Sequence, residues 1–146
     1  MTSLVGSHET NSGEQTEALG AQLAGSLMPG DVVLISGELG TGKTTFVRGA
    51  ARALGVSGPV TSPTFTIGQR HPAKPPAAWV SHLDLYRLSS LRDEDPDLLA
   101  DYLAPDTIAF IEWPAVAEHE LEELGHIARR VSLSHGGGDR RSVEIA

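Results

Sequence analysis

The stretch Gly37-Glu38-Leu39-Gly40-Thr41-Gly42-Lys43-Thr44 decides the fold, because it fits the pattern G-x-x-x-x-G-K-[ST] of a phosphate-binding loop. The residues just before it, 31–36, are mostly apolar and β-branched, which predicts a strand buried on both faces. Residues 45–54 carry apolar side chains at helical spacing and are followed by Gly55, which predicts a helix and its end. Strand, glycine turn and helix therefore follow one another in the order that a phosphate site needs.

In such a loop, backbone N–H groups and the positive end of the helix dipole surround a phosphate group. Lys43 is expected to reach the β- and γ-phosphate oxygens, and Thr44 to ligate Mg²⁺. The alternative, a glycine-rich turn that only caps a helix, is disfavoured by the strand and helix on either side. The loop residues expected to contact a nucleotide are Gly37, Glu38, Leu39, Gly40, Thr41, Gly42, Lys43, Thr44 and Thr45.

Composition excludes several classes of function. The chain has 146 residues, the size of one domain, and its 11 Lys and Arg against 19 Asp and Glu give a net charge of −8. An acidic surface binds nucleic acid poorly, so a partner must hold any RNA involved. The absence of cysteine excludes disulfides, thiolate nucleophiles and Cys-ligated zinc. No apolar run approaches the roughly 20 residues of a membrane span, and the N-terminus lacks a signal-peptide core, so we expect a cytoplasmic protein.

The N-terminal part divides at about residue 13. Residues 1–12 are polar and are expected to be loose or to form a short edge strand, ahead of a single domain over residues 13–146. From Glu14 to Met28 leucines recur every four residues, which predicts a helix capped by Ser12 or Thr10. Its expected role is to pack on the sheet; the alternative is that the segment ahead of it contacts an adenine ring.

Prolines and hydroxyl side chains dominate residues 56–66, which predicts an ordered extended loop after the phosphate-loop helix. Because switch segments occupy this position in nucleotide-binding proteins, Thr61, Ser62 or Thr64 are candidates for sensing a γ-phosphate or its magnesium. Residues 69–76 contain three prolines and are expected to form an irregular exposed connection.

Two further strands are predicted over residues 79–86 and 107–112, and each carries a carboxylate near its end. Pro114 stops the second strand, so Glu112 lies at the sheet edge where parallel strands end and where ligands bind. We expect Asp84 to hold the magnesium water shell and Glu112 to polarise the attacking water or to help bind magnesium. The alternatives are a structural Asp84–Arg87 ion pair, a strand-end role for Glu112, and a core role for His82.

The remaining segments are predicted from local patterns. An acidic run over residues 92–97 leads into a short helix over residues 98–103, and a second helix over residues 115–124 has an acidic face that is solvated or meets a basic partner. Residues 130–146 predict a hairpin that turns at residues 136–138, to which we assign no function. The fold class is therefore a single-domain α/β protein of the P-loop NTPase type, with a mostly parallel sheet flanked by helices and a C-terminal hairpin.

Four motifs in this order resemble the TsaE (YjeE) family. They begin at Gly37 (Gly-Glu-Leu-Gly-Thr-Gly-Lys-Thr-Thr), Thr61 (Thr-Ser-Pro-Thr-Phe), His82 (His-Leu-Asp-Leu-Tyr-Arg-Leu) and Glu112 (Glu-Trp-Pro). The resemblance covers nearly the whole chain from about residue 13, and the last two motifs make it specific. It implies a weak magnesium-dependent ATPase of tRNA threonylcarbamoyladenosine modification that works with TsaB and TsaD and meets tRNA only through them. Its ATP hydrolysis would reset that complex between turnovers.

Carried onto this chain, the resemblance implies roles for particular residues. Lys43, Asp84 and Glu112 would serve catalysis, and Thr44, Asp84 and Glu112 would surround magnesium. The switch-like threonine would be Thr64, in the loop that also holds Thr61. Trp113 would lie beside the nucleotide or the partner, while His82 and Arg87 would support the site in roles that the resemblance does not define.

Two rival functions use the same loop. A small-molecule kinase would need an acceptor pocket and an arginine-bearing lid, but the segments after Asp84 and Glu112 are mainly acidic. A nucleotide-dependent binding switch that hardly hydrolyses ATP would need Lys43 and Thr44 but would not depend on Glu112.

Overall fold

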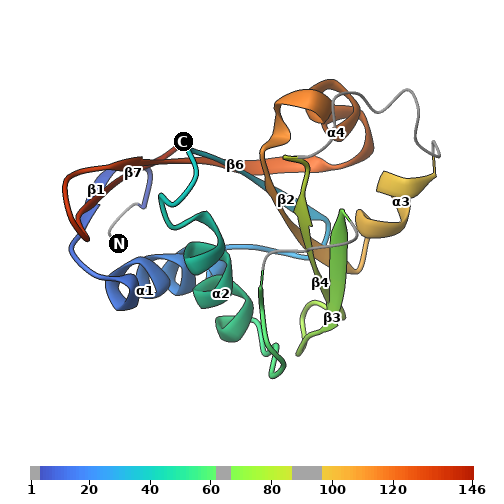
Figure 1. Ribbon diagram of the computed structural model, residues 1–146. Helices are drawn as coiled ribbons and strands as arrows, with labels where there is room; N and C mark the ends of the chain where they lie inside the picture. Colours follow the sequence, from blue (N-terminus) through green and yellow to red (C-terminus); the bar gives the residue numbers. More distant parts are fainter. Residues whose placement is uncertain (1–3, 62–66, 87–96) are drawn as a thin grey trace.

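The computed structural model describes residues 4–61, 67–86 and 97–146 (Figure 1). Strands and helices alternate along most of the chain. In order they are β1 (Gly6–Thr10), α1 (Gly13–Ala24), β2 (Asp31–Ser36), α2 (Lys43–Ala53), β3 (Gly68–Pro72), β4 (Trp79–Asp84), α3 (Leu98–Tyr102), β5 (Thr107–Glu112), the 3-10 helix η1 (Pro114–Ala117), α4 (Glu118–Leu124), β6 (His126–His135) and β7 (Arg141–Ile145).

The strands form one seven-stranded sheet in the order β1-β7-β6-β2-β5-β4-β3. Its four central strands, β6, β2, β5 and β4, run parallel, and the outer strands β1, β7 and β3 pair antiparallel to their neighbours. The predicted α/β fold class is confirmed, including the C-terminal hairpin of β6 and β7. Because β2 lies in the middle, the loop that follows it opens at the centre of the sheet edge.

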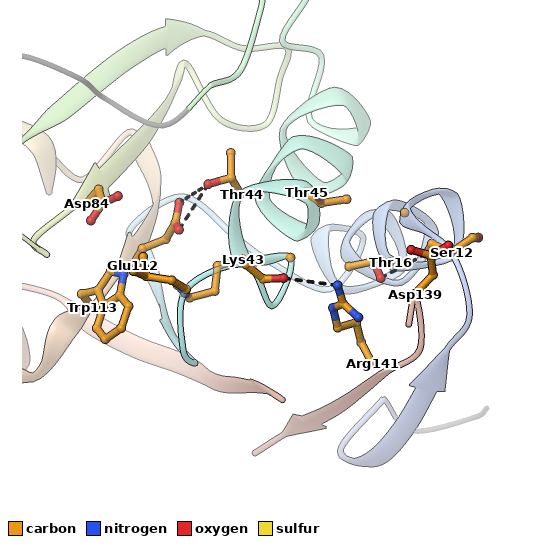
Figure 2. Close-up of a pocket in the computed structure, with 14 residues that line it drawn as sticks. Ser12, Thr16, Lys43, Thr44, Thr45, Asp84, Glu112, Trp113, Asp139 and Arg141 are labelled. Carbon is orange, nitrogen blue, oxygen red and sulfur yellow. Dashed lines mark hydrogen bonds between the residues drawn. The ribbon is translucent and has the colours of Figure 1, made fainter. Parts of the chain in front are cut away.

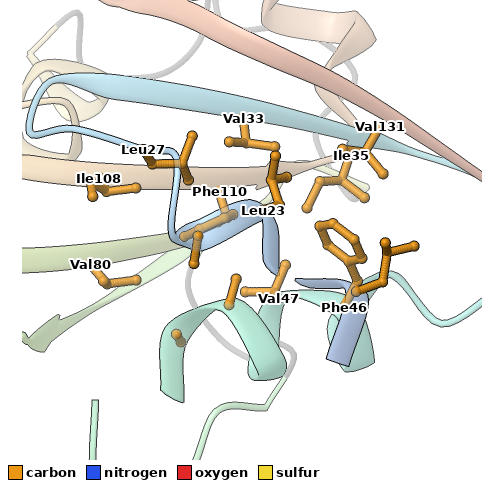
Figure 3. Packing of buried hydrophobic residues seen from close by; sticks show 14 of the residues in the cluster. Leu23, Leu27, Val33, Ile35, Phe46, Val47, Val80, Ile108, Phe110 and Val131 are labelled. Carbon is orange, nitrogen blue, oxygen red and sulfur yellow. The ribbon is translucent and has the colours of Figure 1, made fainter. Parts of the chain in front are cut away.

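Helices cover both faces of the sheet, so the molecule has three layers (Figure 1). Figure 3 shows Leu23 and Leu27 from the α1 side and Phe46 and Val47 of α2 packed on the inner strands. The opposite face carries a second cluster that includes Leu99 of α3 and Leu121 of α4. None of the helices in the described ranges is long and apolar enough to cross a membrane.

Two glycines let α1 and α2 pack backbone to backbone. A Cβ atom on Gly49 would lie 2.0 Å from the Glu17 carbonyl oxygen, and one on Gly20 would lie 2.2 Å from the Phe46 carbonyl oxygen. Real Cβ atoms do not approach so closely, so each glycine is required by its neighbour across the contact. This contact holds the start of α1 beside the phosphate-binding loop.

The N-terminal segment resolves the alternatives left by the sequence. Residues 6–10 form the edge strand β1, paired antiparallel with β7, rather than a loose segment. Ser12 caps α1 by accepting a hydrogen bond from the Gln15 N–H. The helix ends at Ala24 instead of Met28, yet Leu27 still packs in the core as an irregular residue.

The strand expected over residues 79–86 ends at Asp84, and two other segments differ from prediction. Residues 68–72, expected to begin an irregular connection, form the edge strand β3 against β4, and Pro72 is tolerated because it lies at the strand's end. The expected single helix over residues 115–124 is the 3-10 turn η1 followed by α4, and Trp113 ahead of η1 has a left-handed conformation. Periodicity alone does not report either feature.

Candidate nucleotide-binding site

A cavity of about 400 Å³ opens at the edge of the sheet where β4 and β5 end (Figure 2). The phosphate-binding loop, the start of α1, the ends of β4 and β5, and the turn between β6 and β7 all contribute to its wall. Its lining residues are Ser12, Gly13, Thr16, Leu39, Gly40, Gly42, Lys43, Thr44, Thr45, Asp84, Glu112, Trp113, Asp139 and Arg141.

The backbone of the phosphate-binding loop needs its glycines. Gly40 and Gly42 adopt φ angles of 76° and 96°, a region that side chains disfavour. A Cβ atom on Gly37 would lie 2.5 Å from the Leu133 carbonyl oxygen. Gly42 also precedes α2 without a side-chain cap. The helix's first N–H groups therefore face the cavity as donors for an anion.

Lys43 is the buried cation of the site, with only 5% of its surface exposed. Its Nζ donates to the carbonyl oxygens of Gly37 and Glu38, each at 2.8 Å, and lies 4.5 Å from the centre of the Trp113 ring. Burial lowers the pKa of Lys43, while the carboxylates of Glu112 and Asp84 oppose that shift. The ammonium group thus rests inside the loop among groups that favour a positive charge.

Trp113 adopts a left-handed backbone conformation with a φ of 57° and is the only non-glycine residue of the described chain with a positive φ. Such a conformation costs of the order of 1 to 3 kcal/mol and persists where surrounding structure enforces it. Here the Trp113 N–H donates to the Ile35 carbonyl at 3.1 Å, and the ring lies 4.8 Å from that of Tyr86. The strained turn places the indole over Lys43.

Glu112 is a carboxylate with only 2% of its surface exposed. Thr44 Oγ1 donates to it at 3.0 Å, the contact drawn in Figure 2. The oxygen that accepts this bond, Glu112 Oε2, also lies 2.5 Å from His82 Nε2. Asp84 is directly paired with Glu112 in the register of β4 and β5. Burial raises the pKa of Asp84; the hydrogen bond from the Tyr86 N–H opposes that shift and the Glu112 carboxylate adds to it.

The oxygen donors of this site fit Mg²⁺. Within the part of the chain that the structure describes, no three or more His, Cys, Asp or Glu side chains group together as a metal site. Magnesium needs no such group, because it keeps several waters and takes phosphate oxygens from its nucleotide. The Thr44 hydroxyl in contact with Glu112, with Asp84 alongside, would supply hard oxygen ligands to such a shell.

Comparison with known proteins now decides the family. The family model described as "Threonylcarbamoyl adenosine biosynthesis protein TsaE" matches residues 10–143. The chain belongs to the TsaE family. It is 44% identical to the tRNA threonylcarbamoyladenosine biosynthesis protein TsaE of Streptomyces coelicolor over 121 residues, which cover 83% of this chain and 80% of that protein. The Bacillus subtilis TsaE protein is 34% identical over 131 residues, covering 89% and 78%.

A solved structure agrees with the fold of this TsaE-family chain. The crystal structure of Bacillus subtilis YdiB superposes with a TM-score of 0.71 at 28% sequence identity, covering 94% of this chain and 81% of that one. The resemblance drawn from the four motifs is therefore confirmed at the level of family and fold.

The structure of this TsaE-family chain gathers most, but not all, of the candidate residues around the cavity. Gly37, Glu38 and Thr41 shape the loop without lining the cavity, and His82 lies behind Glu112. Thr61 is exposed and does not line the cavity. Three other candidates, Ser62, Thr64 and Arg87, lie outside the described residues.

Sequence reasoning missed the turn between β6 and β7, to which it assigned no function. Asp139 and Arg141 line the cavity, and Arg141 Nη2 donates to the Gly40 carbonyl at 3.2 Å. His135 Nε2 lies within 3.3 Å of the Leu39 carbonyl oxygen. The hairpin was readable from sequence, but its place beside β2 was not. The start of α1 also lines the cavity with Gly13 and Thr16, whereas the sequence offered only the segment ahead of this helix, which ends at Ser12, as an alternative contact for an adenine ring.

Proposed function

We propose that this protein binds and hydrolyses Mg²⁺-ATP as an accessory protein of tRNA threonylcarbamoyladenosine biosynthesis. The names of its family and relatives support the pathway. The ATPase proposal rests on one observation. Lys43, Thr44 and Glu112 lie together at the N-terminus of α2, which has no side-chain cap. Phosphoryl transfer is catalysed mainly by positioning and charge neutralisation, which this arrangement supplies.

Each residue has a distinct proposed task. Lys43 leaves its carbonyl partners for the β- and γ-phosphate oxygens, and the loop N–H groups hold the same phosphates. Bound magnesium would neutralise phosphate charge, with Thr44, Glu112 and Asp84 in its ligand and water shell. Glu112 also orients the attacking water. The opposite end of the cavity, beside Ser12 and Arg141, has room for the base and ribose.

The proposed partners are the TsaB and TsaD proteins, and the proposed role of hydrolysis is to reset their complex between turnovers in the cytoplasm. Exposed apolar side chains at the site support a partner surface: Leu39 is 62% exposed and Tyr86, which packs on Trp113, is 52% exposed. The net charge of −8 disfavours direct binding of tRNA, so the partner complex would hold the RNA.

The test is the ATP hydrolysis rate of the purified protein with and without the TsaB–TsaD complex, for wild type and Glu112→Ala. We expect slow turnover alone and faster turnover with the complex. Glu112→Ala should lose hydrolysis in both conditions while retaining ATP binding by calorimetry. Glu120→Ala, which removes an exposed glutamate of α4, is the matched control and should retain basal turnover.

A different pattern would contradict the proposal. If the complex leaves turnover unchanged and a small-molecule acceptor drives ATP consumption, the protein is a kinase. If the protein binds ATP but Glu112→Ala has no effect on its slow turnover, it is a nucleotide-dependent binding switch.

A further inference from the structure

His82 is a fully buried histidine whose one polar contact among the described residues is the Glu112 carboxylate. Its Nε2 approaches Glu112 Oε2 at 2.5 Å, while its buried Nδ1 has no hydrogen-bond partner within residues 4–61, 67–86 and 97–146. A histidine kept for packing or for strand structure would gain nothing from an unpaired ring nitrogen, because such a buried group costs free energy. The ring is therefore oriented by Glu112.

His82 and Asp84 are separated by one residue in β4, and this spacing places both side chains beside Glu112. In β4 the side chains of His82 and Asp84 point to the same face, because residues two apart share a face of a strand. The parallel register pairs His82 with Phe110 and Asp84 with Glu112 on β5. His82 thus meets the Glu112 carboxylate from the interior, and Asp84 flanks it on the cavity side.

Two side chains that can donate hydrogen bonds contact the Glu112 carboxylate. Thr44 Oγ1, which lines the cavity, donates to Oε2 at 3.0 Å and reaches Oε1 at 3.3 Å, and the fully buried His82 ring contacts the same Oε2 through Nε2. A carboxylate this deeply buried needs donors, since an ionised group without them is strongly destabilised. Removing the His82 donor would free the carboxylate to turn away from Thr44.

We propose that His82 is a positioning residue for Glu112: its Nε2–H holds the carboxylate in the orientation in which it faces Thr44 and the magnesium-nucleotide. This inference rests on the proposed function, because Glu112 must act on Mg²⁺-ATP for its orientation to matter. Partners that orient metal-site ligands in this way commonly change metal affinity or activity 10- to 100-fold when they are removed.

Two amide substitutions separate positioning from packing. In His82→Gln the side-chain nitrogen lies as many bonds from Cα as Nε2 does, so the donor to Glu112 is retained. In His82→Asn the amide nitrogen takes the place of Nδ1, and that donor is lost. Ser81→Ala is the matched control, because Ser81 is buried on the opposite face of β4 and its Oγ has no partner among the described residues.

Three quantities would be measured for each variant: kcat and KM for ATP, nucleotide affinity in EDTA and in Mg²⁺, and the melting temperature. We expect His82→Asn to lose about 10- to 100-fold in kcat and most of the gain in affinity that Mg²⁺ confers, with unchanged affinity in EDTA. His82→Gln and Ser81→Ala should stay within about threefold of wild type.

The inference is overturned if His82→Asn keeps wild-type kcat and magnesium dependence. It is also overturned if the Gln and Asn variants lose nucleotide affinity equally in EDTA and in Mg²⁺ together with a lowered melting temperature, which is the result of a purely structural role. Failure of the proposed function looks different: wild type itself would not hydrolyse ATP, and the magnesium titration of nucleotide affinity would still decide the role of His82.

Discussion

At the scale of single residues, the partly buried carboxylate of Asp84 should lower the stability of the folded protein. Its pKa is raised first by burial, and the Glu112 carboxylate adds to the shift. The ionised carboxylate therefore destabilises the folded state at neutral pH. Asp84→Asn keeps the acceptor for the Tyr86 N–H and should raise the free energy of unfolding of the nucleotide-free protein by up to about 1 kcal/mol, limited by solvent screening. Urea denaturation checks this.

The stability gained by Asp84→Asn should depend on pH, in the direction set by the raised pKa of Asp84. A carboxyl group with a raised folded pKa is neutral in both states below its unfolded value near 3.8 and penalises folding above its folded pKa. The gain from Asp84→Asn should therefore be full at neutral pH and disappear as the pH falls through that window. A variant less stable than wild type at neutral pH would mean that Lys43 stabilises the charged carboxylate more than burial penalises it.

At the scale of elements, the close contact of α1 and α2 should tolerate no methyl group. Gly49→Ala would place a Cβ atom 2.0 Å from the Glu17 carbonyl oxygen, so the helices must separate. Such overpacking typically costs about 1 to 3 kcal/mol, partly offset by the better helix propensity of alanine. The control Gly58→Ala has no atom within 4 Å and should change the urea midpoint little. Equal midpoints for the two variants would contradict the contact.

The turn between β6 and β7 should contribute to nucleotide affinity through the loop that it braces. Arg141 donates to the carbonyl oxygens of Gly40 and Gly138. Arg141→Ala should weaken ATP binding about 3- to 10-fold in calorimetry, since a net hydrogen bond of this kind is worth about 1 kcal/mol. The control Arg140→Ala removes only an exposed ion pair with Glu9 and should bind normally. Equal losses would point to a nonspecific effect of charge.

At the scale of the whole molecule, nucleotide binding should stabilise together segments that are far apart in the chain. The cavity is lined by residues from the start of α1, the phosphate-binding loop, β4, β5 and the turn between β6 and β7. Because a ligand that binds only the folded state stabilises it, Mg²⁺-ATP at 100 times its Kd should add about 2.7 kcal/mol. The shift in thermal unfolding should vanish in Lys43→Ala, and an equal shift in that variant would place the binding elsewhere.

Several features of the fold and site follow from local sequence patterns. The apolar run 31–36, the glycine spacing from Gly37 to Gly42 and the helical pattern after Lys43 predict β2, the phosphate-binding loop and α2, because each depends on neighbouring residues only. Pro114 ends β5 and so delivers Glu112 to the sheet edge. The edge strand β3 was missed because a proline-rich segment has no strand periodicity of its own.

The sequence by itself determined the family, the glycine-rich loop of residues 37–44 and the positions of Asp84 and Glu112 at strand ends. Only the tertiary structure decided that β6 lies beside β2, which brings Asp139 and Arg141 to the cavity. It also decided the left-handed turn at Trp113 and the contact of His82 with Glu112. The physical reason is how far apart in the sequence the interacting residues lie. Loop geometry and strand ends are set by adjacent residues, whereas strand order and cross-strand register depend on packing between segments far apart in the chain.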